Sequence, residues 1–145
     1  MQIGTKFSVS IHILLSVEVF KRSHKVTSDF IASSVNTNPV VIRKLMGNLR
    51  DAGLISIAQG TGGIELTRPP KDISLLDVYA AVEPKQEMFK IHTDTAPGCP
   101  VGGNIGDLLS PVFGEVQNDF QRSLKSVKLS DLLGTLKELN ARRND

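Results

Sequence analysis

The feature that most constrains the fold is residues 38–50, where apolar side chains recur with the spacing of one helical face. They occupy positions 42, 45, 46 and 49. Asn38 followed by Pro39 predicts the start of this helix, because asparagine can accept a hydrogen bond from a free N–H and proline has no N–H. Gly53 is typical of the residue after a helix end. We therefore expect one amphipathic helix between Asn38 and Gly53.

The opposite face of this helix differs from an ordinary solvated surface, which usually carries pairs of glutamate and lysine. It carries cations, amides, exposed valines and a glycine: Asn38, Val40, Val41, Arg43, Lys44, Gly47 and Asn48. These groups suit phosphates, base edges and thymine methyl groups. The composition favours a recognition helix in the major groove of DNA.

The preceding segment predicts the first helix of a helix-turn-helix. Residues 26–35 read as a short helix capped by Thr27, with Val26 and Ile31 placed for a hydrophobic staple. Residues 36–38 are turn formers and give a tight connection. Two short helices joined in this way place the second one in the major groove.

The following segment predicts a β-hairpin. Strand-like residues 54–58 and 64–67 flank the glycine-rich residues 59–63. This glycine-rich run lacks the Lys and Ser/Thr ending of a phosphate-binding P-loop and opens no helix. Behind a helix-turn-helix it is a wing, whose Gln59 and Thr61 we expect along the minor groove or its phosphates.

A family resemblance is carried by Gly-Leu-Ile-Ser at 53–56, Gly-Thr-Gly-Gly at 60–63 and the run from Asp72 to Glu83. The chain resembles the Rrf-two family of bacterial winged-helix regulators over essentially its whole length. The resemblance implies a homodimeric transcription factor, usually a repressor. Many members carry arginine just before the wing glycine, where this chain has Gln59, so we expect weaker binding or an altered sequence preference.

The expected fold class is mainly α with a small β-hairpin wing (α+β). A winged helix-turn-helix domain with its packing helix would span residues 1–83, and a sensor loop with dimerisation helices would span residues 84–145. Residues 5–20 predict the first helix. Ser74 and Asp77 predict a capping box for a helix at 75–82, with Ile73 and Val78 as a staple. Residues 85–92 favour a further helical turn.

Composition and charge are consistent with this class. The chain has 145 residues, of which 40 % are hydrophobic, and one cysteine, which suits a reducing compartment. No signal peptide or membrane span is evident, so we expect a soluble cytoplasmic protein. Residues 1–71 carry nine Lys/Arg against four Asp/Glu, a net +5, whereas residues 72–145 carry eight against eleven, a net −3. The basic half predicts the side that meets a polyanion, although ordinary surface charge can give the same asymmetry.

The predicted DNA contacts follow from side-chain chemistry. The residues expected to contact bases are Asn38, Val40, Val41, Lys44 and Asn48. Those expected to contact the DNA backbone are Lys6, Arg43 and Arg50. The connection between the helices adds Thr37, and the wing adds Gln59 and Thr61. Lys44 can contact phosphate or read guanine. The basic connection 21–25 can equally contact phosphate or have no role.

Cys99 is the one residue here with redox chemistry. If Pro100 is the first helical residue, Cys99 is the N-cap, and the positive helix end favours its reactive thiolate. The alternative is a buried, inert cysteine. Cluster-binding members of the resembled family carry three cysteines in this loop. One cysteine with His92 cannot replace them, so we expect no iron–sulfur cluster and no metal. Without a second cysteine, oxidation would give a disulfide across a dimer or a mixed disulfide with a low-molecular-weight thiol.

The C-terminal part predicts a long amphipathic helix from residue 100 onward. Its apolar stripe includes Ile105, Leu108, Leu109, Val112, Phe113, Val116, Phe120 and Leu124. This stripe fits pairing with a second copy across a twofold axis, and the alternative is packing against its own domain. Pro111 should kink the helix, or divide it with Ser110 as a new N-cap. A short last helix at 129–139 and a frayed tail from Arg142 complete the prediction.

No enzyme site emerges, because the histidines lie far apart and no nucleophile has an evident base. The sequence predicts a dimeric transcriptional regulator that binds a pseudo-palindromic operator. Its signal would be oxidation of Cys99, a small ligand or a partner protein. The alternative is a winged-helix adaptor that binds proteins and no longer binds DNA specifically. The partners expected from the first hypothesis are double-stranded DNA and a second copy of the chain, with no membrane.

Overall fold

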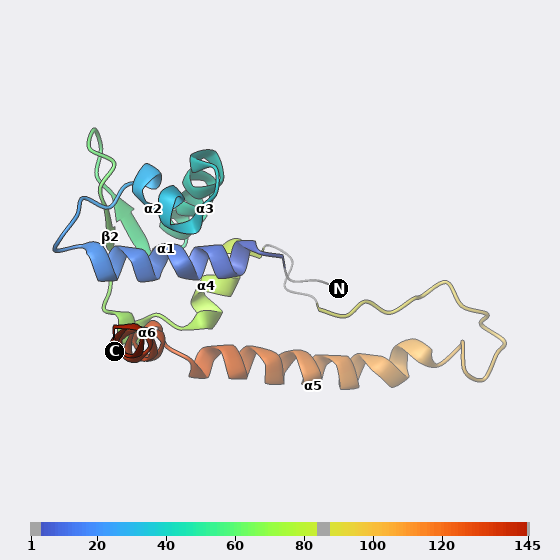
Figure 1. Cartoon of the computed structure of the whole chain (residues 1–145). Helices are drawn as coiled ribbons and strands as arrows, with labels where there is room; N and C mark the ends of the chain where they lie inside the picture. The colour runs from blue at the N-terminus through green and yellow to red at the C-terminus, as the bar shows by residue number, and fades with distance from the viewer. Residues whose placement is uncertain (1–3, 84–87, 145) are drawn as a thin grey trace.

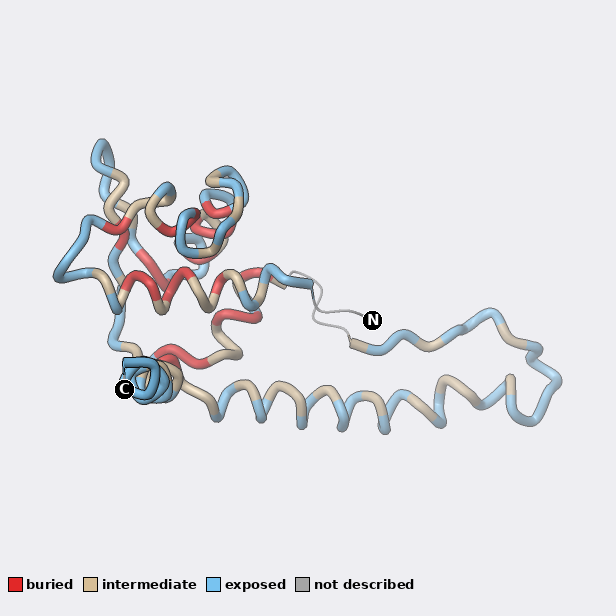
Figure 2. The backbone as a smooth tube through the Cα atoms, viewed as in Figure 1, coloured by how far each residue is buried: buried red, intermediate tan, exposed pale blue. Residues whose placement is uncertain are grey.

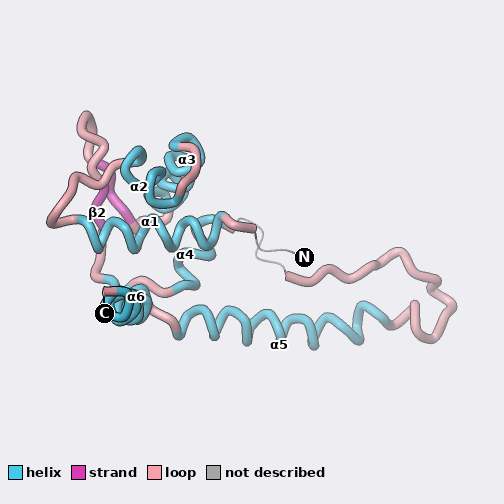
Figure 3. The backbone as a smooth tube through the Cα atoms, in the orientation of Figure 1, coloured by secondary structure: helices cyan, strands magenta, loops and turns pink. Residues whose placement is uncertain are grey.

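The computed structural model describes residues 4–83 and 88–144, and it shows a helical domain from which one long helix extends (Figure 1). The elements in chain order are α1 (Lys6–Phe20), α2 (Ser28–Val35), α3 (Pro39–Asp51), β1 (Ile55–Ile57), β2 (Ile64–Leu66), the 3₁₀ turn η1 (Pro70–Asp72), α4 (Leu75–Val82), α5 (Ile105–Ser126) and α6 (Leu129–Arg143). The predicted class is confirmed: the chain is mainly helical, with one antiparallel hairpin behind a helix-turn-helix (Figure 3).

The helix-turn-helix forms where its capping residues predict. The Thr27 hydroxyl accepts a hydrogen bond from the Phe30 N–H at 3.3 Å and opens α2. Asn36 has φ of 60°, a left-handed conformation that asparagine tolerates and that ends α2. The Asn38 side chain accepts from the Val40 N–H at 2.8 Å and opens α3. Two side-chain caps and the left-handed turn at Asn36 therefore define where α2 begins and ends and where α3 begins.

The wing is a short hairpin in which Ile55 pairs with Leu66 and Ile57 with Ile64. Its turn contains Gly60 with φ of 81° and Gly62 with φ of 70°, which a side chain with a Cβ would strain. The turn is closed by a hydrogen bond from the Gly62 N–H to the Ala58 carbonyl at 2.9 Å. The turn of the hairpin projects from the helical domain (Figure 1).

One hydrophobic core joins α1, the helix-turn-helix, the hairpin and α4 (Figure 2). Its fully buried side chains come from every one of these elements and include Ile13, Leu14, Ile31, Ile42, Leu49, Leu54, Ile55, Ile73 and Val78. The staple pairs predicted before α2 and α4 lie in this core. The helix α3 packs against this core through its four buried apolar residues.

The start of α6 is tied to the entry of α4. Ser74 and Asp77 form the predicted capping box, with bonds of 2.9 and 3.1 Å. The Leu129 N–H donates to the Ile73 carbonyl at 2.8 Å, and the Leu129 side chain is buried in the core. The predicted division of the chain after residue 83 remains a prediction.

Four details of the C-terminal part differ from the prediction. The long helix begins at Ile105 and not at Pro100, because residues 97–104 form turns. The division expected at Ser110 was wrong, since Pro111 lies inside an undivided α5 and the Ser110 hydroxyl donates to the Gly106 carbonyl at 2.7 Å; the alternative of a kink at Pro111 stays a prediction. The last helix runs to Arg143, so the frayed tail predicted from Arg142 was wrong for that residue and the next.

The fourth difference concerns residues 85–92, for which a helical turn was expected. Residues 88–92 are not helical, and residues 84–87 lie outside the described part of the chain. Among the helices that the structure describes, none combines the length and the apolar character needed to cross a membrane.

Candidate DNA-binding surface and cysteine loop

The outward face of α3 carries the residues that the sequence predicts to read bases. With 100° per residue, Val40, Lys44 and Asn48 follow one line along the helix, and the buried apolar residues lie on the opposite side. The side chains of Val40 and Val41 are 61 % and 46 % exposed. Such exposure of two β-branched residues has no packing purpose within the described chain, and it offers methyl groups to a partner.

Lys44 differs from the other cations of α3 because it has no ion-pair or hydrogen-bond partner among the described residues. Arg43 lies 3.9 Å from the Asp29 carboxylate on α2, and Arg50 lies 3.3 Å from the Asp51 carboxylate. Both arginines are on one flank of the helix and are more than half exposed, so these pairs are weak and screened by water. Lys44 is thus the cation of α3 that is free to meet DNA without first leaving a carboxylate.

Asn38 has a structural task in addition to its predicted one. Its Oδ1 caps α3, and its amide NH₂ offers two further donors to DNA. Thr37 is half-buried in the connection, whereas Asn38 is exposed at the start of α3. Asn48 is half-buried two turns further along the same face.

The other predicted contacts lie apart from α3. Gln59 and Thr61 are exposed in the wing turn, where the Thr61 hydroxyl accepts from the Gly63 N–H at 3.4 Å. Lys6 is exposed at the first residue of α1, at the end of that helix remote from the wing (Figure 1). The structure therefore groups α3 with its N-terminal cap, and it places the wing and Lys6 on different sides of that group.

Cys99 lies in a tight turn before α5 and not at the helix cap. The Gly103 N–H donates to the Cys99 carbonyl at 2.9 Å, and the Asn104 amide donates to the Pro100 carbonyl at 2.7 Å. A Cβ at Gly103 would come within 2.8 Å of the Pro97 carbonyl oxygen, so the turn depends on this glycine. The predicted N-cap role of Cys99 was wrong, and Asn104 takes that position.

The surroundings of the Cys99 sulfur nevertheless lower the pKa of its thiol, which is the direction that the sequence predicts. Cys99 is exposed, and hydrogen bonds from the backbone N–H groups of Gly102 and Val101 hold the pKa of its thiol below the ordinary value. These donors come from the turn instead of a helix end. The buried, inert alternative for Cys99 is therefore wrong. The loop lies at the far end of α5, away from α3 and the wing (Figure 1).

The donor atoms around this loop do not fit an iron–sulfur cluster. A cluster is held by several thiolates, whereas this chain contains one cysteine. His92 lies in the same segment, and its Nε2 lies 3.0 Å from the Asp94 carbonyl oxygen. Within residues 4–83 and 88–144, no three His, Cys, Asp or Glu side chains come together as a metal site.

Comparison with known proteins identifies the family. The model of the Rrf2 family, described as iron-dependent transcriptional regulators, matches residues 3–135. The chain is 39 % identical over 134 residues to YwnA of Bacillus subtilis strain 168, a candidate HTH-type transcriptional regulator, covering 92 % of this chain and 98 % of YwnA. YwgB of the same organism, described in the same way, is 40 % identical over 140 residues, covering 96 % of this chain and 87 % of YwgB.

Solved structures share the fold. A crystal structure of a candidate DNA-binding protein has a TM-score of 0.70 and 37 % identity, covering 88 % of this chain and 98 % of that one. CymR, the global cysteine regulator of B. subtilis, has a TM-score of 0.68 and 22 % identity, covering 92 % and 97 %. IscR of T. potens has a TM-score of 0.70 and 21 % identity, covering 96 % and 90 %.

These relatives are regulators of transcription and not enzymes. The match to the family model extends from the residues before α1 into α6, so it includes the helix-turn-helix, the wing and the long helix. The chain belongs to the Rrf2 family of transcriptional regulators.

Proposed function

We propose that this regulator is a homodimeric repressor that binds a pseudo-palindromic operator and is gated by oxidation of Cys99. The observation that carries the DNA-binding part is the outward face of α3, where an unpaired Lys44 lies between exposed valines and Asn48. Lysine, asparagine and small apolar side chains are the groups that distinguish base pairs in the major groove. Such a repressor acts in the cytoplasm, where DNA is present and a single thiol stays reduced.

Dimerisation is supported by the uncovered stripe of α5. One flank of the stripe contains Phe120, which packs edge-to-face on Tyr79 of α4 with ring centroids 5.5 Å apart. The other flank contains Leu108, Val112 and Val116, which are 62 %, 52 % and 44 % exposed. Successive apolar residues spaced by four along a helix favour burial against a second copy of that helix.

A twofold dimer explains why the operator would be pseudo-palindromic. The twofold axis between the paired α5 helices would relate two copies of α3. These copies would enter two half-sites separated by about one helical turn of DNA or a multiple of it. Repression then needs only occupancy of the operator. It is the usual role in the family that the sequence resembles.

The gate rests on the exposed Cys99 thiolate. A peroxide would oxidise the thiolate to a sulfenic acid, with the peroxide O–O bond broken and water released after protonation. A thiol would then displace the hydroxyl as water and form a disulfide, either with the partner copy or with a low-molecular-weight thiol. Because a single cysteine is the available thiolate, we propose that this regulation operates without an iron–sulfur cluster.

The test is binding of the purified protein to a labelled duplex from its own upstream region, against a scrambled duplex of equal length. Each duplex is titrated with the reduced protein, with the peroxide-treated protein and with Cys99→Ser. The proposal predicts specific, salt-dependent binding that peroxide abolishes in the parent protein and leaves intact in Cys99→Ser.

Two other outcomes separate the parts of the proposal. Specific binding that peroxide does not change would support operator binding and contradict regulation by oxidation of Cys99. Absence of salt-dependent binding to any duplex would contradict DNA binding and favour the protein-adaptor alternative.

A further inference from the structure

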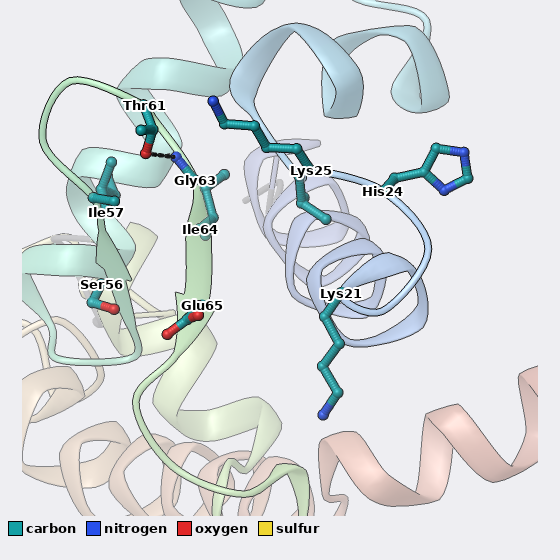
Figure 4. A pocket seen from close by; sticks show the side chains of 11 residues that line it. Lys21, His24, Lys25, Ser56, Ile57, Thr61, Gly63, Ile64 and Glu65 are labelled. Atoms are coloured by element: carbon teal, nitrogen blue, oxygen red, sulfur yellow. Dashed lines mark hydrogen bonds between the residues drawn. The ribbon is translucent and has the colours of Figure 1, made fainter.

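A cleft of about 570 Å³ lies between the α1–α2 connection and the wing (Figure 4). One wall is formed by the connection and contains Lys21, His24 and Lys25. The other wall is the hairpin, whose residues in the cleft include Thr61, Ile64 and Glu65. The sequence left the basic connection without an assigned role, and the structure places it directly beside the wing.

The two walls are held at a fixed separation. The Ile64 N–H of β2 donates to the Val26 carbonyl at 3.1 Å, which ties the end of the connection to the hairpin. The His24 ring packs against Phe20 and Phe30, with centroid distances of 5.6 and 5.2 Å. These contacts hold the backbone of the neighbouring Lys25 beside the wing, so binding has only the Lys25 side chain left to order.

The charges divide the cleft into two ends. Lys21 and Glu65 lie toward one end, and Lys21 is already paired with Glu18 at 2.7 Å. Lys25 reaches toward the other end, where Thr61 lies (Figure 4). Lys25 forms no ion pair with any residue in the described part of the chain, and it is exposed. The end that contains Lys25 and Thr61 is therefore basic and lined by a hydroxyl.

The wing itself lacks a cation. Residues 55–66, from the first strand to the second, contain no lysine or arginine. Gln59 stands at the position before the wing glycine. A hairpin laid along DNA without a cation gains little from the phosphates, so a positive charge must come from a neighbouring segment.

We propose that the Lys25 end of this cleft seats a backbone phosphate of the operator, beside the groove along which the wing lies. The Lys25 ammonium supplies the charge and the Thr61 hydroxyl supplies a hydrogen-bond donor. The seat contributes affinity for any DNA sequence and fixes the wing on the duplex. This inference rests on the proposed DNA binding and adds a contact from outside α3.

The test compares the full-length reduced parent protein with Lys25→Gln and Lys71→Gln on the upstream duplex and on a scrambled duplex. Lys71 is the matched control, because it is an exposed lysine on η1 and does not line the cleft. Binding is measured between 50 and 200 mM salt by fluorescence anisotropy. Circular dichroism confirms that each variant is folded.

Lys25→Gln removes one phosphate contact from each copy in the proposed dimer, and hence two in all, so the salt slope should fall by about 1.8 and binding should weaken on the order of fiftyfold at 0.1 M salt. We expect Lys25→Gln to show this loss equally on both duplexes, with the ratio of their affinities unchanged. Lys71→Gln should retain the slope and affinity of the parent protein.

Parent-like slope and affinity in Lys25→Gln would overturn the phosphate seat while leaving specific binding by the parent protein as support for the proposed function. A loss confined to the upstream duplex would also overturn it, because that pattern indicates base recognition. If the parent protein binds neither duplex, the proposed function and this inference fall together.

Discussion

The proposed DNA binding makes use of Lys44, a cation that no carboxylate in the described part of the chain compensates. Three cations lie on the outer side of α3, and Asp29 and Asp51 oppose the two arginines. Lys44 meets no such carboxylate within the described residues. Its ammonium is therefore available to a phosphate or to the acceptor edge of guanine.

Replacing Lys44 distinguishes these two roles. If Lys44 contacts phosphate, Lys44→Ala should weaken binding to all duplexes alike and reduce the salt slope by about 1.8, which is about 0.9 for each copy in the proposed dimer. If Lys44 reads guanine, the variant should lose about 1–3 kcal/mol on one base pair and relax the preference there. Anisotropy titrations over single-base operator variants measure both effects. Lys137→Ala on the exposed side of α6 is the control, and a Lys44→Ala variant that also matches the parent protein would remove Lys44 from the interface.

The residues of α3 were predictable because their spacing alone separates the buried face from the exposed face. The ion pair between Arg43 and Asp29 was not predictable, since it depends on how α2 crosses α3. Lys25 was recognised as basic, but its position beside the wing requires the tertiary fold. Side-chain chemistry was thus readable from the sequence, whereas side-chain partners were not.

The Cys99 thiol gives a prediction that depends on pH. Because backbone N–H groups lower its pKa, the thiolate should dominate from a lower pH in the folded protein than in the unfolded chain. The rate of alkylation by iodoacetamide should therefore rise at lower pH in buffer than in concentrated urea. Coincident pH profiles in the two solvents would contradict stabilisation of the thiolate by the turn.

At the level of elements, local capping signals determined most of the boundaries. Thr27, Asn38 and Ser74 all accept the backbone bonds that their positions predict. The start of α5 was predicted wrongly at Pro100, because proline is also common in turns. The pair Gly102-Gly103 just after it was the available signal, since glycines permit the close approach to the Ala96 and Pro97 carbonyls.

The capping box of α4 predicts a specific loss of stability. Ser74 is buried and its hydroxyl accepts from the Asp77 N–H, so Ser74→Ala should lower the free energy of unfolding by about 1 kcal/mol. Ser33→Ala, at an exposed site within α2, is the control. Both variants are compared by urea unfolding at one protein concentration, because the stability of the proposed dimer would depend on concentration. An equal loss in both would indicate that the cap contributes nothing special.

At the scale of the whole molecule, the arrangement is a DNA-binding domain with a long arm. The arm α5 contacts α4 along one flank, and the Cys99 loop lies at its outer end (Figure 1). In the proposed dimer, a signal at Cys99 would have to reach α3 through α5 and the second copy, because the Cys99 loop lies away from α3 within one chain. The amphipathic stripe was predictable from spacing, but the flank that its own domain covers was not.

A charge placed in the uncovered flank should separate the two copies. Val112→Asp puts a carboxylate among exposed apolar residues, and burying it unpaired would cost more than the dimer gains. We expect a monomer by light scattering and a loss of operator affinity on the order of a hundredfold, because the two half-sites are then bound separately. Asn118→Asp adds the same charge at an exposed residue about 120° around α5 from Val112 and should remain dimeric. A dimeric Val112→Asp would place the interface elsewhere.

The most direct test of the central claim is hydroxyl-radical footprinting of the reduced protein on its upstream DNA. The account predicts two symmetric protected half-sites whose centres are about one helical turn apart or a multiple of it, and their joint loss in Val112→Asp. A single unsymmetric footprint, or no protection at concentrations that saturate binding, would contradict a dimer that reads a pseudo-palindrome through α3.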